Sequence, residues 1–253
     1  MAVVTESKIH DLPDLRNRAP VFRDREEVGE ILARMLREFE GSGALVLAIP
    51  RGALVIGAVI ARQLHLALDT VVVAKVTPPW NPEFGFGGVA WDGTVWLDPA
   101  IVPRLGLRPE EIEQAIWRAS DKVVQRSRLL RGERPFPALA GRPVIVVDDG
   151  LATGSTMRVA LQALRKAGAS RVVVAVGTGH HEALWSLAQD VDAVYCPNLR
   201  ETRTFSAVGE AYRNFDQVED DEAAGILRGL EGEGERREAQ VASEERAERT
   251  EIG

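Results

Sequence analysis

Residues 144–156 read VIVVDDGLATGST, and this stretch decides the fold around it. Four consecutive apolar residues are typical of a strand that is buried on both faces of a parallel sheet. Two aspartates, a run of small residues and a helical pattern over residues 156–167 follow directly. Small residues allow backbone N–H groups to close around an anion, and the N-terminus of a helix adds a favourable dipole. The stretch therefore predicts a strand, an anion-binding turn and a helix.

The side chains of this stretch indicate that the anion is a phosphate attached to a sugar. The hydroxyls of Thr153, Ser155 and Thr156 are able to donate hydrogen bonds to phosphate oxygens. Asp148 and Asp149 do not suit a bare phosphate, but they can accept hydrogen bonds from vicinal hydroxyls or help to place a Mg²⁺ ion. The lysine of a nucleoside-triphosphate loop and the G-x-G-x-x-G turn of a dinucleotide site are both missing. An acidic cap on a tight turn would not need all these features together, so we predict a site for a phosphorylated ribose.

Strand patterns and helical patterns alternate through most of the chain. Short continuous apolar runs predict strands, and apolar residues at helical spacing predict helices. The expected strands span residues 45–49, 70–76, 144–147, 171–176 and 193–195, and the expected helices span residues 23–39, 53–64, 108–130, 156–167 and 181–188. This alternation implies a doubly wound α/β fold with a mostly parallel sheet of about five strands, flanked by helices. Ligands of such sheets bind at the carboxyl ends of the strands.

The stretch VIVVDDGLATGST resembles the thirteen-residue signature of the type I phosphoribosyltransferases, which use 5-phosphoribosyl 1-diphosphate (PRPP). The resemblance covers roughly residues 22–220 and looks closest to a bacterial phosphoribosyltransferase-like group. It implies that Asp148 and Asp149 bind the 2- and 3-hydroxyls of the ribose and belong to the catalytic set. It implies Mg²⁺ as the cofactor, held by the same two aspartates, directly or only through water. The loop that would bind the 5-phosphate consists of Ala152, Thr153, Gly154, Ser155 and Thr156.

Two basic residues are similar to parts of the family's diphosphate site. Ile49-Pro50-Arg51-Gly52 lies between an expected strand and an expected helix, so Arg51 and Gly52 are assigned to the diphosphate loop. Ala53 stands where similar sequences have a second glycine, which puts a diphosphate contact from its backbone in doubt. Lys75 ends the next apolar run and resembles the family's basic residue near the diphosphate, so it joins the catalytic set. The simpler alternatives are a solvated surface residue for Arg51 and a snorkelling lysine for Lys75.

Two segments outside the alternating pattern are candidates for covering the site. Residues 77–94, TPPWNPEFGFGGVAWDGT, are too long and too rich in Gly and Pro for a simple connection, so we expect a flexible lid. Glu83 on this lid would contact either an acceptor or only water. Residues 195–215 are expected to form a small hood, in which the aromatic side chains either pack or stack on the acceptor. These aromatic residues are Phe205, Tyr212 and Phe215.

Ala152 bears on the identity of the acceptor. In the family's enzymes for 6-oxopurines, an aspartate at this position serves N7 of the base, whereas this chain has alanine, as adenine and orotate enzymes do. The resemblance therefore disfavours a 6-oxopurine and implies some other nitrogenous acceptor.

Composition and charge describe an ordinary globular chain of 253 residues, with 45% hydrophobic residues and a formal net charge of −7. The acidic balance argues against nucleic acid as a partner, and no apolar run reaches membrane-spanning length. A single cysteine and the lack of a signal-peptide pattern at the N-terminus favour a cytoplasmic protein. We expect an N-terminal arm over residues 1–20, a phosphoribosyltransferase-like domain over 21–227 and a charged, disordered tail over 228–253.

Three functions are compatible with these residues. The first is an enzyme that transfers the phosphoribosyl group from PRPP to a nitrogenous acceptor and releases diphosphate. The second is a regulatory protein that senses PRPP or a nucleotide without transferring it, and the third is a binding module that has lost transfer activity. Because the family is commonly dimeric, the resemblance also implies a possible homodimer.

Overall fold

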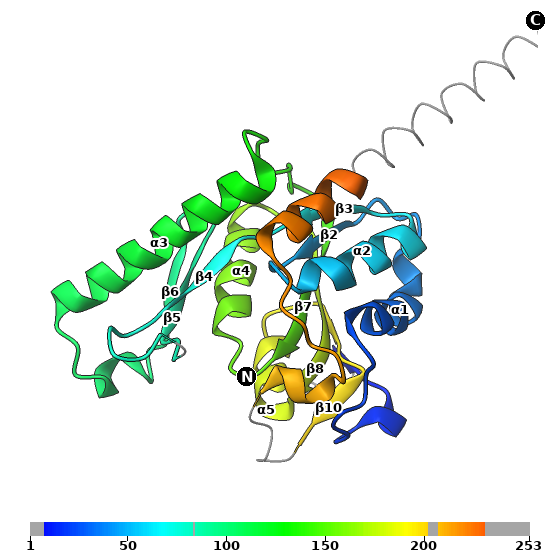
Figure 1. Ribbon diagram of the computed structural model, residues 1–253, viewed down its shortest axis with the longest axis horizontal. Helices are drawn as coiled ribbons and strands as arrows, with labels where there is room; N and C mark the ends of the chain where they lie inside the picture. The colour runs from blue at the N-terminus through cyan, green and yellow to red at the C-terminus, as the bar shows by residue number, and fades with distance from the viewer. Residues whose placement is uncertain (1–7, 83, 202–206, 231–253) are drawn as a thin grey trace, which may run out of the picture.

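The computed structural model describes residues 8–82, 84–201 and 207–230, and it confirms a mostly parallel sheet flanked by helices (Figure 1). Within these residues the central sheet has seven strands in the order β1-β9-β8-β7-β2-β3, with β10 also paired to β8. Each of these pairings is parallel. The strands are β1 (Ile9–His10), β2 (Leu45–Ala48), β3 (Ala67–Thr70), β7 (Pro143–Leu151), β8 (Arg171–His180), β9 (Ala193–Tyr195) and β10 (Asn198–Arg200).

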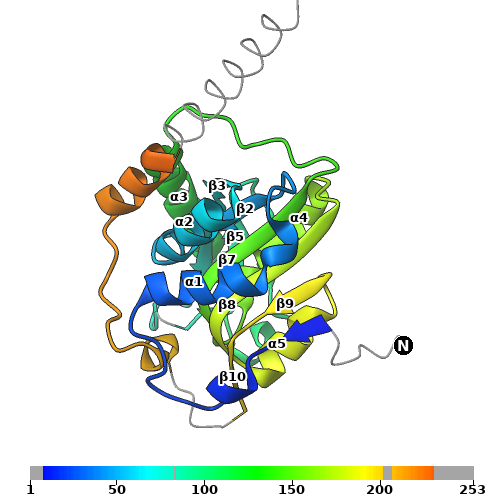
Figure 2. The same cartoon turned by 90° about the vertical axis from the view of Figure 1, so that its right-hand side faces the viewer.

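The central strands are buried on both faces because their alternate residues enter two separate hydrophobic cores. In β2, Val46 packs with residues of α1 (Arg25–Met35) and α2 (Ala53–Leu64), on the face that Figure 2 shows toward the viewer. The neighbouring Leu47 packs with residues of α4 (Ser155–Lys166) and α5 (His181–Ala188). Helices on both faces are what the unbroken apolar runs of the strands require.

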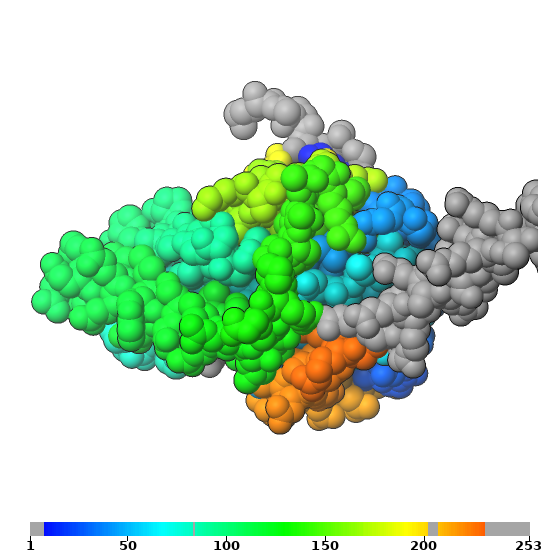
Figure 3. All heavy atoms as spheres, turned by 90° about the horizontal axis from the view of Figure 1, so that it is seen from above, coloured from blue at the N-terminus to red at the C-terminus, as the bar shows by residue number. Residues whose placement is uncertain are grey.

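A second, smaller sheet lies between α4 and the long helix α3 (Pro109–Arg131). It is antiparallel, in the order β4-β5-β6, and consists of β4 (Val73–Val76), β5 (Gly87–Ala90) and β6 (Val95–Leu97). This sheet and α3 project from one end of the molecule, at the left of Figures 1 and 3. Part of the segment expected as a lid, residues 77–94, is therefore a strand of this sheet.

The strand predicted over residues 70–76 is wrong, because the chain divides this run between the two sheets. β3 ends at Thr70, and β4 begins at Val73 and pairs with β5 instead of the parallel sheet. A continuous apolar run carries no sign of a change of sheet. Asp69 interrupts the apolar pattern of β3, and in the structure it pairs with the buried Arg131 at the end of α3.

Asp24 caps the N-terminus of α1, and the helix is shorter than the sequence predicts. The carboxylate of Asp24 accepts a hydrogen bond of 3.0 Å from the backbone N–H of Glu27. The predicted helix over residues 23–39 ends at Met35, and a separate 3-10 helix, η3 (Arg37–Phe39), follows.

Both ends of the described chain pack against the core. Lys8 donates hydrogen bonds to the carbonyls of Ala188 and Val191, at 3.3 and 2.9 Å, and β1 lies beside β9. Residues 220–230 are helical, and Ala223 and Leu227 are buried. Residues 231–253 of the expected tail lie outside the described residues, as do Glu83 and Phe205. Among the described helices, none combines the length and apolar character needed to cross a membrane.

Candidate active site

The acidic pair lies inside β7, because this strand continues beyond Val147, where its end was predicted. β2 accompanies β7 only until Ala48 lies beside Val147, whereas β8 continues beside β7 as far as Leu151. Residues 148–151 are therefore paired with β8 on one side while their other edge faces the loop that follows β2. The predicted strand end is too early because a partner strand, and not the local residues, decides how far the pairing extends.

Asp149 is held by side chains from two distant parts of the chain. Arg25, the first residue of α1, donates from Nε to Oδ1 at 3.0 Å and from Nη2 to Oδ2 at 3.2 Å. The hydroxyl of Tyr212 donates to the backbone carbonyl of Asp149 at 2.6 Å. Burial raises the pKa of the Asp149 carboxyl, and the Arg25 guanidinium acts in the opposite direction. These contacts fix both the backbone and the carboxylate of Asp149.

Asp148 has a different environment, since successive residues of a strand point to opposite faces. Burial, and secondarily the charge of Asp149, raises the pKa of Asp148 to about 8, while the charge of Lys75 opposes the shift. One of its carboxyl oxygens accepts a 2.8 Å hydrogen bond from the backbone N–H of Asp149. A cation or a hydroxyl donor placed at Asp148 would favour the ionised form of this carboxyl.

The loop after β7 forms the N-terminus of α4, which begins at Ser155. Gly154 precedes the helix with a φ of 77°, a left-handed conformation that favours glycine. Ala152 and Thr153 are exposed, Thr156 is half-buried, and Ser155 is buried. The hydroxyls of Thr153 and Ser155 lie 3.2 Å apart. The loop therefore presents hydroxyls and free helical N–H groups to one small region, which suits a phosphate.

The loop between β2 and α2 packs directly against the acidic pair. A Cβ atom added to Gly52 would lie 2.4 Å from Oδ2 of Asp149 and 2.5 Å from Nε of Arg25. Glycine is therefore required here by the close approach of the two charged side chains. Ala53, which follows Gly52, is buried in the core beneath this loop.

Arg51 in the same loop pairs with acidic residues near the C-terminal end of the described chain. Its Nη1 lies 3.4 Å from Oε2 of Glu219 and 3.6 Å from Oδ1 of Asp220. Asp220 also lies 3.7 Å from Nε of Arg126 on α3, so it bridges the loop and the long helix. The side chain of Arg51 is 22% exposed and lies against these two carboxylates.

Lys75 lies on the second sheet and not at the end of a parallel strand. It lies on β4 opposite Gly88 of β5, and its charge acts on Asp148. Its aliphatic stem passes beside Gly85, where an added Cβ would lie 3.3 Å from Cδ of the lysine. The folding of β4 and β5 thus brings Lys75 to the site.

Two aromatic residues expected in the hood pack around the Arg25–Asp149 pair. The rings of Tyr212 and Phe215 lie 4.8 Å apart, and the Arg25 guanidinium lies 4.1 Å above the ring of Phe215. Tyr212 is buried and also contacts Phe22, with ring centroids 5.5 Å apart. Tyr212 is therefore a packing residue, and one face of Phe215 is covered by Arg25.

Sequence reasoning missed Arg25 as a member of the site. It lies in the run Arg23–Glu27, RDREE, whose mixed charges are typical of a solvated first helical turn. Its partner Asp149 is 124 residues away in the chain. A local pattern therefore contains no signal for this contact.

The donor atoms at the site bear on the kind of cation it suits. In the part of the chain that the structure describes, no group of three or more His, Cys, Asp or Glu side chains is arranged to hold a metal ion. Carboxylate oxygens such as those of Asp148 and Asp149 suit a hard ion such as Mg²⁺, which completes its shell with water and substrate oxygens. The donor set therefore fits Mg²⁺ bound together with a phosphorylated substrate.

A doubly wound sheet with an acidic pair and a loop at a helix N-terminus along its carboxyl edge is typical of α/β proteins that bind nucleotides or sugar phosphates. Residues 24–187 match the family described as the phosphoribosyl transferase domain. The chain therefore belongs to the phosphoribosyl transferase family, as the stretch over residues 144–156 predicted.

Individual relatives agree with this family. The chain is 35% identical over 207 residues to proteins named "putative phosphoribosyl transferase" from two Mycobacterium tuberculosis strains, CDC 1551 and H37Rv. These alignments cover 82% of this chain and 46% of each relative, so the chain spans about half the length of the curated relatives it matches. A crystal structure of a Thermus thermophilus protein aligns with a TM-score of 0.68 and 36% identity, over 82% of this chain and 97% of that one.

Proposed function

We propose that the protein transfers the 5-phosphoribosyl group from PRPP to a nitrogenous acceptor and releases diphosphate. One observation carries the proposal: an acidic pair, a loop at a helix N-terminus and a basic loop adjoin one another at the carboxyl edge of the sheet. These three features correspond to the three parts of PRPP, which are the ribose hydroxyls, the 5-phosphate and the diphosphate. Membership of the phosphoribosyl transferase family supports this correspondence.

The first part of the proposal assigns the 5-phosphate to the N-terminus of α4. The loop hydroxyls of Thr153, Ser155 and Thr156 and the free N–H groups of the first helical turn would donate to the phosphate oxygens. Because the helix is 12 residues long and packed in the core, these donors are held in place before the ligand binds.

The second part assigns the ribose to Asp148 and Asp149, which would accept hydrogen bonds from its 2- and 3-hydroxyls. The same carboxylates fit Mg²⁺ held directly or through water. When bound, Mg²⁺ would supply positive charge to the diphosphate leaving group. The high pKa of Asp148 is compatible with either ligand, since both a cation and a hydroxyl donor favour its ionised form.

The third part concerns the diphosphate and the reaction itself. The bond from C1 of the ribose to a diphosphate oxygen breaks, and an acceptor nitrogen forms the new bond to C1. Arg51 and Lys75 would neutralise the charge that the departing diphosphate gains, after Arg51 leaves Glu219 and Asp220. The protein contributes positioning of the reactants and charge stabilisation.

Ala152 supports an acceptor other than a 6-oxopurine. Its side chain is an exposed methyl group at the phosphate loop, and a methyl group has no hydrogen bond to offer N7 of a purine.

A binding module that has lost transfer activity is the second candidate, and it is favoured by Ala53, which stands where similar sequences have a second glycine. The buried position of the Ala53 methyl group weakens that case, since this methyl group packs in the core and leaves the loop open to diphosphate. Release of diphosphate separates the two candidates.

Calorimetric titration of PRPP with Mg²⁺ into the wild type and an Asp148→Asn/Asp149→Asn variant tests the proposal. A Glu113→Gln/Asp121→Asn variant makes the same kind of acid-to-amide change at two exposed positions on α3 and serves as the matched control. We expect binding in the wild type and the control and its loss in the site variant. Diphosphate release is then measured with adenine, orotate and hypoxanthine as acceptors, and hypoxanthine is expected to be the poorest. A folded wild type that does not bind PRPP would refute the proposal.

A further inference from the structure

Arg25 is bonded in a way that leaves it one orientation. Its side chain is 10% exposed, and Nε and Nη2 bond side-on to the two carboxylate oxygens of Asp149. The remaining nitrogen, Nη1, donates to the backbone carbonyl of Asp216 at 2.6 Å. The face of the guanidinium lies over the ring of Phe215. A guanidinium held on three sides can act as a rigid fork for a carboxylate.

This contact determines where the free lone pairs of Asp149 point. An ionised carboxylate has about four lone-pair positions, and the two bonds from Arg25 occupy two of them. The bidentate bond fixes the plane of the carboxylate, and the bond from Tyr212 to the Asp149 carbonyl fixes the backbone that carries it. The two remaining lone pairs therefore have fixed directions in the site.

We propose that Arg25 is a positioning residue that aims the free lone pairs of Asp149 at one hydroxyl of the bound ribose, and thereby selects ribose over the sugar that lacks this hydroxyl. The inference rests on the proposed function, because it takes a ribose phosphate as the ligand. Arg25 acts only through Asp149 and does not touch the sugar.

The position of Gly52 supports this role. The loop that carries Arg51 approaches the pair so closely that a Cβ atom on Gly52 would lie 2.5 Å from Nε and 2.8 Å from Nη2 of Arg25. Arg25 is thus confined by this loop in addition to Phe215 and Asp216. A salt bridge with a purely structural role would not need to lie between the acidic pair and the neighbouring ligand loop.

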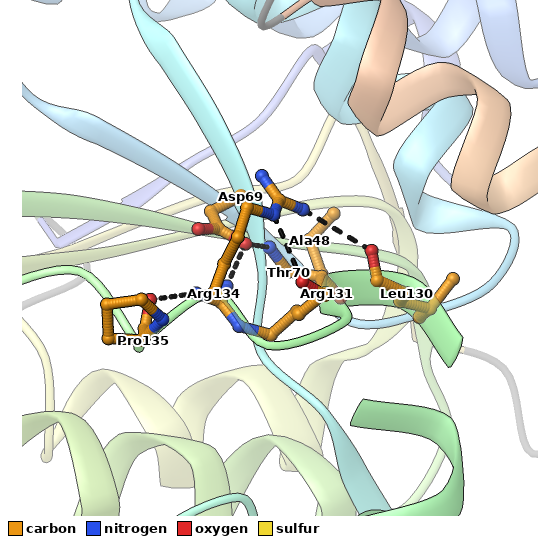
Figure 4. A network of polar contacts seen from close by, with 7 residues as sticks. All are labelled: Ala48, Asp69, Thr70, Leu130, Arg131, Arg134 and Pro135. Atoms are coloured by element: carbon orange, nitrogen blue, oxygen red, sulfur yellow. Dashed lines mark hydrogen bonds and ion pairs between the residues drawn. The ribbon is translucent and has the colours of Figure 1, made fainter. Parts of the chain in front are cut away.

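The chain offers a matched control in a second buried arginine–aspartate pair. Arg131 on α3 bonds to Asp69 and to the carbonyl of Pro135, in the network that Figure 4 shows. Arg131 is 7% exposed, and these bonds join α3 to the chain that follows it and to β3, which β2 separates from β7 in the sheet. Its loss should reduce stability without changing sugar selection.

The test measures the dissociation constants of ribose 5-phosphate and of its 2-deoxy and 3-deoxy analogues, which carry the same phosphate and lack diphosphate. The proteins are the wild type and the Asp149→Asn, Arg25→Lys, Arg25→Met and Arg131→Met variants. In the Asp149→Asn variant, removal of one of the two sugar hydroxyls should no longer weaken binding. That hydroxyl is the one that Asp149 binds in the wild type. We expect the wild type to prefer ribose over that analogue by about tenfold or more, as for one hydrogen bond to a charged group.

Arg25→Met should abolish the preference for ribose 5-phosphate over the analogue that lacks that hydroxyl. The preference over the other deoxy analogue should remain. Arg25→Lys, whose single ammonium cannot grip a carboxylate at two points, should reduce it in the same direction while keeping the charge and the fold. Arg131→Met should leave both preferences as in the wild type. Combining Arg25→Met with Asp149→Asn should cause no further loss, since both changes remove one interaction.

The outcomes separate the two proposals. If the Arg25 variants keep the wild-type preference, or lose both preferences equally, Arg25 is not a positioning residue although the protein still binds ribose 5-phosphate. If the wild type binds the three sugars equally, Asp149 recognises neither hydroxyl and the inference about Arg25 is wrong. The assignment of the phosphate to the loop of α4 would still hold. A wild type that binds none of them refutes the proposed function itself.

Discussion

Replacing Gly52 by alanine tests whether the diphosphate loop and the acidic pair are packed as one unit. Gly52 has φ −57° and ψ −38°, which any residue adopts, so the substitution carries no backbone penalty. The added Cβ would lie 2.4 Å from Oδ2 of Asp149 and 2.5 Å from Nε of Arg25. Because these distances are shorter than a van der Waals contact, either the ion pair separates or the loop moves.

The size of the effect follows from whichever of these two structural changes costs less free energy. Breaking a buried ion pair costs about 3–5 kcal/mol, whereas an overpacked site that relaxes costs about 1–3 kcal/mol. Alanine at the start of a helix regains at most about 1 kcal/mol. We therefore expect Gly52→Ala to lower the free energy of unfolding by about 1–2 kcal/mol. Displacement of Asp149 should also weaken ribose 5-phosphate binding by about tenfold or more, which corresponds to about 1.4 kcal/mol.

The assay combines urea denaturation with calorimetric titration of ribose 5-phosphate. Gly57→Ala is the control, since it adds a Cβ to the same helix, where it would meet the flexible end of Leu68 at 2.9 Å and Ala48 Cβ at 3.3 Å. This control should bind the ligand as the wild type does. If Gly52→Ala matches the wild type in both stability and affinity, the close packing of the loop against Asp149 is refuted.

Three further predictions concern neighbouring groups. Because folding raises the pKa of Asp148 from about 3.9 to about 8, its contribution to stability is complete below about pH 3.9 and is lost as the pH rises toward 8. Between pH 5 and 7, the free energy of unfolding of Asp148→Asn should therefore rise relative to that of the wild type by up to about 1.4 kcal/mol per pH unit. If urea titrations show the same pH dependence of this free energy in both proteins, the prediction is wrong. Tyr212→Phe leaves the carbonyl of Asp149 without its 2.6 Å donor and should cost about 1–3 kcal/mol in the same assay, where a loss under about 0.5 kcal/mol would be inconsistent with a buried bond. Asp220→Asn removes one charged partner of Arg51, so calorimetry should show up to about fivefold tighter PRPP binding. The affinity for ribose 5-phosphate should not change, and weaker PRPP binding would count against a diphosphate role for Arg51.

The sequence alone determined the class of fold and the central stretch of the site. Alternating apolar runs and helical spacings are properties of neighbouring residues, so they survive without knowledge of the tertiary structure. Residues 144–156 carry the strand, the acidic pair and the phosphate loop in one contiguous run, and the resemblance to the family rests on that run. The cap of α1 by Asp24 was predictable for the same reason, since its partner is three residues away.

Only the tertiary structure decided which distant residues complete the site and where the strands end. Arg25 and Tyr212 reach Asp149 across 124 and 63 residues, and Lys75 arrives through a second sheet that an unbroken apolar run concealed. β7 continues to Leu151 because β8 stays beside it after β2 has ended. The physical reason is common to these cases: hydrogen bonds and ion pairs between distant segments depend on how the segments pack, and packing leaves no periodic pattern in the residues that it joins.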